Sequence, residues 1–354
     1  MPASTHDTVQ AVRAGEALDL DNLLPWLQQQ RPDLTDTPKV SQYSGGVSNW
    51  TYCLSFKNTE IVLRRGPDGT KAKGAHDMQR EYNLQRELKP VFKPVPQVYA
   101  YCADKTLIGR DFYVMEKLNG IIPRRNFPAD IRLTESQVSD LCTGAIDTLI
   151  DLHNVDYKQA GLAHLGKGEG YTQRQIHGWI GRFTKARTWN VPSAVKVTNW
   201  LSSHMPQDEN LCITHNDYRF DNLVLDPQQP AHILGVLDWE LATIGDPLMD
   251  LGNTLAYWVE ADDDRLMQAT RKQPTHLKGM LTRQQVIEYY CRKTGVSADN
   301  FSFYQVYGLF RLAVIAQQIY YRYYHKQTRN RAYKHYWFFV HYLLHRCNRI
   351  IKRA

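Results

Sequence analysis

A carboxylate, an amide and a second carboxylate follow one another in one short β-like part of the chain. Asp217 and Asn222 are five residues apart in "ITHNDYRFDNLVLD", residues 213–226, and Asp238 comes after the apolar run "HILGVL". Buried strands tolerate such groups poorly without partners, so the cluster is either a tight polar turn or a reaction centre. Phosphoryl transfer needs this set, because one carboxylate orients and deprotonates a hydroxyl while an amide and a second carboxylate supply oxygen ligands to Mg²⁺.

The spacing of these residues bears on the choice between a polar turn and a reaction centre. His215, Asp217 and Asn222 give the pattern H-x-D-x-x-x-x-N, and an Asp follows the next predicted strand. This is the arrangement of a protein-kinase-like catalytic loop. The alternative is an Asx-rich turn that is capped by its own side chains. We expect His215 to be structural, donating a hydrogen bond to a backbone carbonyl near the loop.

The hydrophobic pattern predicts the elements that position this loop. Gly74 to Leu88 has helical periodicity. β-like runs with turn signals between them cover residues 39–43, 49–56, 60–65, 96–101 and 112–118. From about Thr134 the pattern is helical, and Thr282 with Gln285 predicts a capping box. The predicted helices cover residues 137–153, 172–187, 193–203, 282–290, 303–324 and 333–351, with one β-like insertion at 211–239.

These elements predict a bilobal α+β fold, and the resemblance stated below implies that it is of the protein kinase-like type. A five-stranded sheet with one inserted helix forms a small N-terminal, nucleotide-binding lobe over residues 1–118. Residues 119–354 form a larger, mostly helical lobe with an embedded β-hairpin, which carries the catalytic loop and the substrate site. Two such lobes imply a cleft between them, which is a common place for a ligand.

The loop "YSGGVSNWTY" joins two of the β-like runs. Its backbone N–H groups are therefore candidates for covering the phosphates of a nucleotide, although a plain hairpin loop fits the same residues. The candidate residues are Ser44, Gly45, Gly46, Val47 and Ser48.

Strand alternation in "EIVLRR" puts Val62 and Arg64 on one face of the sheet and Leu63 and Arg65 on the other. Val62 is then placed to floor an adenine pocket while Arg64 reaches the phosphates. Glu81, on the helix that follows, is the natural anchor for Arg64. The backbone groups expected to bond adenine follow in "FYVMEKL" and belong to Glu116, Lys117 and Leu118.

The chain resembles the aminoglycoside phosphotransferase/choline kinase-like superfamily, which has a protein kinase-like fold. Its closest likeness is to the kinase-like domain fused to some acyl-CoA dehydrogenases and to the stand-alone bacterial relatives of that domain. The motifs that carry the likeness extend from about residue 20 to 325: "SGGVSNWTY", "IVLRR", "GAHDMQREY", "HNDYRFDNLV", "VLDWELATIGDPLMDLG" and "LFRLAVIAQQIY".

The resemblance implies ATP and Mg²⁺ as cofactors. It also implies that Asp217 is the catalytic base, that Asn222 and Asp238 are Mg²⁺ ligands, and that Asp250 braces the catalytic loop from a helix. The chain departs from the wider superfamily at Arg64, where Lys is usual, and a planar guanidinium is not equivalent to an ammonium. Arg at this position favours the acyl-CoA-dehydrogenase-linked group over aminoglycoside resistance enzymes and leaves the choice of ATP or GTP open.

The charge of the chain bears on the substrate. The formal net charge is +7, yet residues 300–354 contain ten Lys and Arg and no Asp or Glu. This region is either a docking surface for a phosphate-bearing ligand or a solvated helix face. Arg311 lies on the predicted helix there and serves either a structural ion pair with an Asp or recognition of a substrate carboxylate or CoA phosphate. Arg219 is a second candidate for substrate contact.

A pocket for a polycationic aminoglycoside should be acidic. The only late acidic run is "WVEADDDRL", residues 258–266, so the sequence favours an anionic substrate such as a hydroxyacyl-CoA. The resemblance favours the same substrate, because related proteins are linked to phosphorylation of 4-hydroxy acids as CoA thioesters. The alternatives are a kinase for aminoglycosides, choline or homoserine, and a kinase-like binding module without turnover.

The six cysteines are scattered without a CxxC pair, which is typical of single thiols in a reducing compartment, so we expect a cytoplasmic protein. No apolar run has the length of a membrane span, and the first residues lack the order of a signal peptide. No nucleic-acid-binding motif accompanies the positive charge. The sequence leaves the oligomeric state open.

Overall fold

The computed structural model describes residues 9–43, 49–67 and 77–354. The chain divides into two compact units, and each is described here by itself. Unit 1 consists of Met1–Thr148, Lys158–Leu162 and Phe220–Leu241, and unit 2 of Leu149–Tyr157, Ala163–Arg219 and Ala242–Ala354. Each unit combines segments that are distant in the sequence, so these units do not test a single boundary at residue 118. The predicted lobe boundary stays a prediction.

Unit 1 is built on an antiparallel sheet with the strand order β1-β2-β3-β4-β6-β5. The strands are β1 (Val9–Gln10), β2 (Lys39–Tyr43), β3 (Trp50–Ser55), β4 (Glu60–Arg65), β5 (Val98–Cys102) and β6 (Phe112–Glu116), and the helices are α1 (Leu20–Gln30), α2 (Met78–Leu88) and α3 (Lys105–Ile108), with α4 (Glu135–His153) continuing into unit 2.

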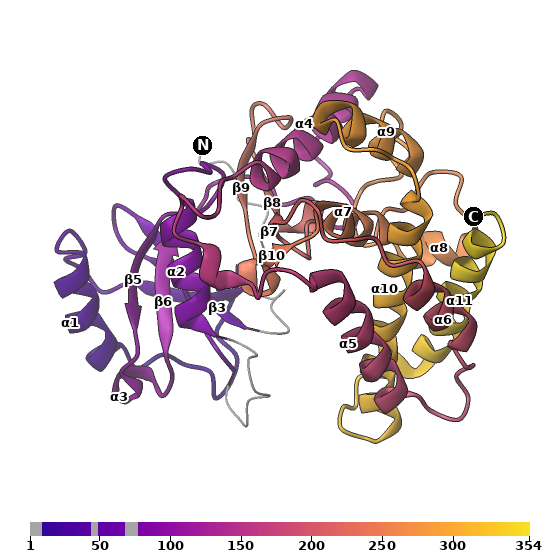
Figure 1. Cartoon of the computed structure of the whole chain (residues 1–354). Coiled ribbons are helices and arrows are strands. Elements are labelled where there is room, and N and C mark those ends of the chain that lie inside the picture. Colours follow the sequence, from indigo (N-terminus) through magenta and orange to yellow (C-terminus); the bar gives the residue numbers. More distant parts are fainter. Residues whose placement is uncertain (1–8, 44–48, 68–76) are drawn as a thin grey trace. The chain divides into compact units, whose positions relative to one another are not determined.

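The two faces of this sheet bury different side chains, as the alternation in the fourth strand predicts. Leu63 packs in the cluster that includes α1, and Val62 packs with Met78 at the start of α2. Figure 1 shows α1 and α2 beside this sheet. Arg64 is two residues after Val62 in the strand, so its side chain is directed toward the same face, which α2 covers.

In the described residues the sheet has six strands rather than the predicted five, because the two-residue β1 pairs with β2 at its edge. A two-residue strand is too short to show alternation, so the hydrophobic pattern does not predict it. The helix α1 was also missed, although Asp19 caps it by accepting a hydrogen bond from the Asn22 N–H. Its internal Pro25 argues against a helix in sequence terms.

The predicted embedded hairpin is present within unit 1 as β8 (Leu223–Leu225) and β9 (Ile233–Val236). Leu223 is paired with Val236, and the Leu237 N–H donates to the Asn222 carbonyl at 2.8 Å. This register brings the residue before β8 and the residues after β9 to the same end of the hairpin.

Unit 2 is mostly helical. Its elements are α5 (Tyr171–Ala186), α6 (Val195–Ser203), α7 (Pro247–Ala256), α8 (Arg265–Thr270), α9 (Arg283–Thr294), α10 (Phe301–Tyr324) and α11 (Tyr336–Ile351), with the antiparallel strand pair β7 (Cys212–Thr214) and β10 (Thr243–Gly245). The predicted capping box of Thr282 and Gln285 is confirmed at the start of α9.

The helices α7 and α10 pack at close range in unit 2. A Cβ added to Gly308 of α10 would lie 2.1 Å from the backbone oxygen of Gly252 in α7. Glycine at both positions therefore lets the two backbones meet. The helix α7 carries Asp250, and this contact ties it to the longest helix of the unit.

None of the helices in the described residues combines the length and the apolar character that a bilayer crossing requires.

Candidate active site

In unit 1, Arg64 is bonded to two acidic side chains. Its Nη2 atom lies 3.0 Å from Asp238 Oδ1 and 3.4 Å from Glu81 Oε2. Arg64 is buried, and only 2% of Glu81 is exposed. β4 supplies the arginine, the first turn of α2 supplies Glu81, and the segment after β9 supplies Asp238.

Further polar groups hold Glu81 in place. Tyr113 donates to Glu81 Oε2 at 3.0 Å, and Asn49 Nδ2 donates to Oε1 at 3.2 Å. Asn49 also donates to Glu240 at 3.1 Å. Burial raises the pKa of Glu81 above its usual value, while the Arg64 charge opposes this shift. These three partners were not identified as site residues, although Asn49 and Glu240 lie inside the recognised motifs.

Asn222 and Asp238 lie at the same end of the β8–β9 hairpin, because the Leu237 N–H bonds to the Asn222 carbonyl. Asp238 has a φ of 68°, in the left-handed region, which Asp tolerates better than most residues. Its Oδ1 meets Arg64, and its Oδ2 makes no contact within the described residues. An amide oxygen and a carboxylate suit Mg²⁺, which takes one or two carboxylates together with phosphate oxygens. The residues therefore fit the implied metal.

The predicted nucleotide contacts in unit 1 are partly described. Ser44, Gly45, Gly46, Val47 and Ser48 lie outside the described residues. The Glu116 N–H already donates to the Gln97 carbonyl at 2.7 Å, so it is used within the sheet. Lys117 and Leu118 line a small hollow of about 60 Å³ with Tyr43, Cys53 and Glu60, among others. Of the three predicted backbone positions, the two that follow the strand therefore line a cavity.

In unit 2 the predicted catalytic loop is fixed by a buried carboxylate. Asp250 is fully buried in α7 and accepts the N–H groups of His215 and Asn216, each at 2.7 Å. His153 Nε2 lies 3.2 Å from the same carboxylate. Burial by itself raises the pKa of Asp250, but these donors outweigh burial and lower it. Asp250 thus bonds the backbone of the predicted loop, with His153 as a partner that the sequence did not indicate, and its role in catalysis stays a prediction.

The residue before Asp217 is held by its side chain as well. Asn216 has a φ of 63°, which Asn tolerates better than most residues. Its Oδ1 accepts from Tyr171 at 3.3 Å and from Asn253 at 3.1 Å, and its amide nitrogen donates to Thr214 at 2.9 Å. The turn that presents Asp217 is therefore fixed by both backbone and side-chain bonds.

Asp217 is partly exposed at this turn and lies beside Arg219, whose Nη2 is 3.2 Å from Asp217 Oδ2. The Arg219 guanidinium lies over the Tyr257 ring, 4.7 Å from its centroid. The Asp217 N–H donates to His215 Nδ1 at 3.2 Å, so His215 has an acceptor role at this atom. His215 is fully buried, and its expected donation to a carbonyl stays a prediction.

An ion pair between Arg311 and an Asp was one of the two interpretations of the sequence. Within the described residues Arg311 forms no such pair. It is buried in α10 and donates to the Asn216 carbonyl at 2.8 Å. Its guanidinium also lies 5.2 Å from the centroid of the Trp179 ring. A buried arginine can bond a carbonyl of a loop as readily as a carboxylate, and sequence alone does not distinguish these partners.

The site residues thus fall into two sets, one in each unit. Arg64, Glu81, Asn222 and Asp238 gather in unit 1, and Asp217, Arg219, Asp250 and Arg311 gather around the loop of unit 2. Their catalytic and binding roles stay predictions.

The family model described as "Phosphotransferase enzyme family" matches residues 39–281, and the chain therefore belongs to this family. The chain is 33% identical to mouse (Mus musculus) acyl-CoA dehydrogenase family member 10 over 290 residues, 81% of this chain and 27% of that protein. It is 32% identical to rat (Rattus norvegicus) acyl-CoA dehydrogenase family member 11 over 328 residues, 90% of this chain and 41% of that protein. The chain spans less than half the length of these curated relatives.

Solved structures support the same fold. A crystal structure of a provisionally assigned aminoglycoside phosphotransferase from Ralstonia eutropha matches with a TM-score of 0.81 and 27% identity, over 96% of this chain and 99% of that one. The aminoglycoside phosphotransferase APH(4)-Ia, in a ternary complex with AMP-PNP and hygromycin B, matches with a TM-score of 0.58 and 15% identity, over 94% and 98% of the two chains. The fold is thus the kinase-like fold of aminoglycoside phosphotransferases, with an antiparallel N-terminal sheet and a helical C-terminal part.

Proposed function

We propose that this chain is a kinase that transfers the γ-phosphoryl group of ATP to the hydroxyl of a hydroxyacyl-CoA, of the 4-hydroxyacyl type, in the cytoplasm. Family membership supports phosphotransfer, and the names of the relatives support an acyl-CoA context. None of the six cysteines forms a disulfide within the described residues, which fits a reducing compartment.

The observation that carries the proposal is the pairing of Arg64 with Glu81 and Asp238, together with a loop that holds Asp217 on a buried brace. Arg64 grips phosphate oxygens, and Glu81 keeps the guanidinium in place. Asp217 orients the acceptor hydroxyl and takes its proton. The backbone position of Asp217 does not depend on its own charge, because Asp250 accepts from the N–H groups of the two preceding residues.

Asn222 and Asp238 would hold Mg²⁺, which neutralises charge on the phosphates during transfer. Asp238 shares one oxygen with Arg64 and keeps the other available within the described residues. The Asp238 carboxylate would thus hold the metal while it stays paired with Arg64.

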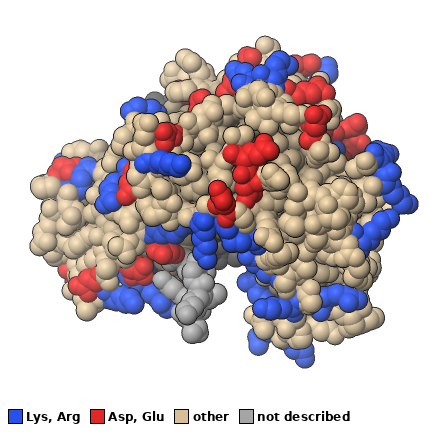
Figure 2. Space-filling view, viewed as in Figure 1, with Lys and Arg blue, Asp and Glu red and all other residues tan. Residues whose placement is uncertain are grey.

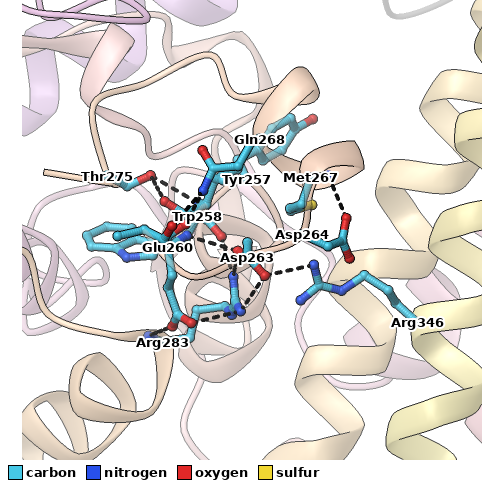
Figure 3. Close-up of polar contacts among 12 residues, drawn as sticks. Tyr257, Trp258, Glu260, Asp263, Asp264, Met267, Gln268, Thr275, Arg283 and Arg346 are labelled. Atoms are coloured by element: carbon cyan, nitrogen blue, oxygen red, sulfur yellow. Dashed lines mark hydrogen bonds and ion pairs between the residues drawn. The ribbon is translucent and has the colours of Figure 1, made fainter.

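The main rival is a kinase for a polycationic aminoglycoside, which needs unneutralised acids in its pocket. Figure 3 shows how the late acidic run is used in unit 2. Arg283 pairs with Glu260 at 2.9 Å and with Asp263 at 2.6 Å, and Arg346 pairs with Asp263 at 3.1 Å. Asp264 caps α8 and accepts from Tyr342. Most of this acidic charge is therefore engaged by the protein itself, which favours an anionic substrate.

The test is a coupled assay of ADP formation with the purified chain, Mg²⁺ and ATP. The acceptors are 4-hydroxyacyl-CoAs, the free hydroxy acids, choline, homoserine and aminoglycosides. We expect the highest kcat/KM for a CoA thioester. A higher kcat/KM for any of the other acceptors would overturn the proposed substrate, and no turnover with any acceptor would favour a non-catalytic binding module.

A further inference from the structure

A hollow of about 560 Å³ lies between α5 and α10 in unit 2. It is lined by Arg182, Lys185, Ala186, Gln318, Tyr321 and Arg322, which we call the α5–α10 hollow. Three of these six residues are cationic, one is aromatic and none is acidic. On the face drawn in Figure 2, basic side chains without acidic neighbours cover the lower part of unit 2, where Figure 1 places the ends of α5 and α10.

The cations of this hollow contrast with the arginines that neutralise the acidic run of the same unit. Within the described residues Arg182, Lys185 and Arg322 form no ion pair, whereas Arg283 and Arg346 both reach Asp263. Lys185 and Arg322 lie in the last turns of their helices, where a cation also stabilises the carbonyl end. That effect does not account for Arg182, which lies a turn earlier.

Arg182 lies close to a second arginine on the same ring. Its guanidinium is 4.2 Å from the centroid of Trp179, and the guanidinium of Arg311 is 5.2 Å from the same centroid. Burial lowers the pKa of Arg182, and the nearby Arg311 charge lowers it further. Two cations lie on one indole, and in the described residues no carboxylate is paired with either of them. They create a positive electrostatic potential that favours the binding of an anion.

Both helices of the hollow also contact the catalytic loop. Tyr171 at the start of α5 donates to the Asn216 side chain, and Arg311 of α10 donates to the Asn216 carbonyl. Arg182 is eleven residues beyond Tyr171, and Arg322 is eleven beyond Arg311, so the backbone positions of each pair are about 16 Å apart along their helix at ~1.5 Å per residue. Gln317 joins the hollow ends of the helices by donating to the Ala186 carbonyl at 2.7 Å.

We propose that the α5–α10 hollow binds the phosphate-bearing nucleotide end of a CoA thioester, with the pantetheine arm extended along the two helices toward Asp217. This inference rests on the proposed function and identifies where the substrate is recognised. Arg182, Lys185 and Arg322 bind the phosphates, and the half-buried Tyr321 ring offers a face on which the adenine stacks.

The direct test measures binding without turnover. Adenosine 3′,5′-bisphosphate, the nucleotide end of CoA, is titrated calorimetrically into the full chain with excess Mg²⁺ and AMP-PNP to fill the ATP site. We expect the Kd to rise about tenfold or more in Arg182→Gln/Arg322→Gln, because two phosphate–cation contacts are lost together. The matched control is Arg349→Gln, an exposed arginine in the last turn of α11, which should leave the Kd unchanged. An equal Kd in the wild type and the double variant would overturn the inference, as would the absence of binding.

A kinetic readout separates this inference from the proposed function. In the double variant the ratio of KM for a hydroxyacyl-CoA to KM for the corresponding hydroxyacyl-pantetheine should rise about tenfold, since pantetheine lacks the nucleotide. If CoA thioesters are phosphorylated and this ratio does not change, the assignment of the α5–α10 hollow as the nucleotide-binding site is wrong and the proposed function stands. If no CoA thioester is phosphorylated but the bisphosphate binds in an Arg182-dependent way, the hollow stands and the proposed substrate is wrong.

Discussion

The two sets of site residues are held in different ways. In unit 1, Arg64 is the shared partner of Glu81 and Asp238, so the positions of these side chains depend on their own charges. In unit 2, Asp217 lies on a turn whose backbone is held by Asp250 and Arg311, so the backbone position of Asp217 does not depend on its carboxylate, although that carboxylate pairs with Arg219. A change of charge in the unit 1 set should therefore disturb structure and ligand binding together. In the second set, the reacting group and the structural brace can be removed separately.

The largest expected effect separates chemistry from structure in the loop. Asp217→Asn should lower kcat by about 10²–10⁴, because the base is lost, while the melting temperature and ATP binding stay close to wild type. Steady-state kinetics and thermal unfolding measure the two quantities on the same sample. Near-normal turnover would remove Asp217 from the mechanism.

The next effect contrasts two buried arginines. Arg64→Met leaves two carboxylates without their cation and should lower the free energy of unfolding by about 3–5 kcal/mol at neutral pH. Arg311→Met leaves a backbone carbonyl without its donor and should lower it by about 1–2 kcal/mol. Chemical denaturation measures both values.

The pH dependence of the Arg64→Met variant follows from Glu81. Burial already raises the pKa of Glu81, and loss of the Arg64 charge raises it further. A raised pKa favours folding of the protonated form. The loss in free energy of unfolding relative to wild type, the deficit, should therefore shrink as the pH falls toward the pKa of Glu81 and grow as the pH rises through it. The deficit of Arg311→Met should not change with pH in this way. Equal deficits with equal pH profiles would contradict the comparison.

A third effect concerns two acids one turn apart on α7. Asp246 caps the helix by accepting from the Met249 N–H at 2.8 Å, and burial raises its pKa to about 6. It therefore stabilises the fold below about pH 4, and that stability, about 2–3 kcal/mol, is lost as the pH rises through about 6. Asp246→Asn keeps a capping oxygen without the charge, so it should become more stable relative to wild type between pH 4 and 7.

The matched control is Asp250→Asn, because the pKa of Asp250 is lowered rather than raised. The charged form of Asp250 stabilises the fold above its unfolded pKa, so this variant should lose more stability at pH 7 than at acid pH. Relative to wild type, Asp246→Asn should therefore gain stability between about pH 4 and 6, whereas the deficit of Asp250→Asn should stay nearly constant there and shrink only as the pH falls below about 4. Parallel profiles would show that the two carboxylates are not held as described.

The smallest effect concerns the metal. Asp238→Ala should weaken Mg²⁺-dependent binding of a nucleotide about tenfold, because a hard oxygen ligand is lost. Titration with excess chelator gives the control, in which the variant and the wild type should differ much less. An unchanged Kd with Mg²⁺ present would show that Asp238 is not a ligand.

The sequence predicts much of the fold because its elements have strong local signals. Alternation in "EIVLRR" assigned Val62 and Arg64 to the same face, and the Thr282 capping box marked the start of α9. α1 and the two-residue β1 were missed, because Pro25 weakens the helical signal and a pair of residues has no period.

The candidate site was predicted where motifs of fixed spacing carry it, as for Asp217 and Asn222. The partners that hold it were not predictable in the same way. Tyr113 reaches Glu81 from a strand 32 positions away, and Arg311 reaches a carbonyl 95 positions away. Such contacts depend on tertiary packing, which local periodicity does not encode.

The most direct test of the central claim follows the phosphoryl group itself. ATP labelled in its γ-phosphoryl group is incubated with the chain, Mg²⁺ and an equimolar mixture of a 4-hydroxyacyl-CoA, the free hydroxy acid, choline and an aminoglycoside. The account predicts label on the hydroxyl of the CoA thioester with the wild type and very little with Asp217→Asn. Label on another acceptor in preference to the thioester, or equal labelling of the thioester by the two proteins, would contradict it.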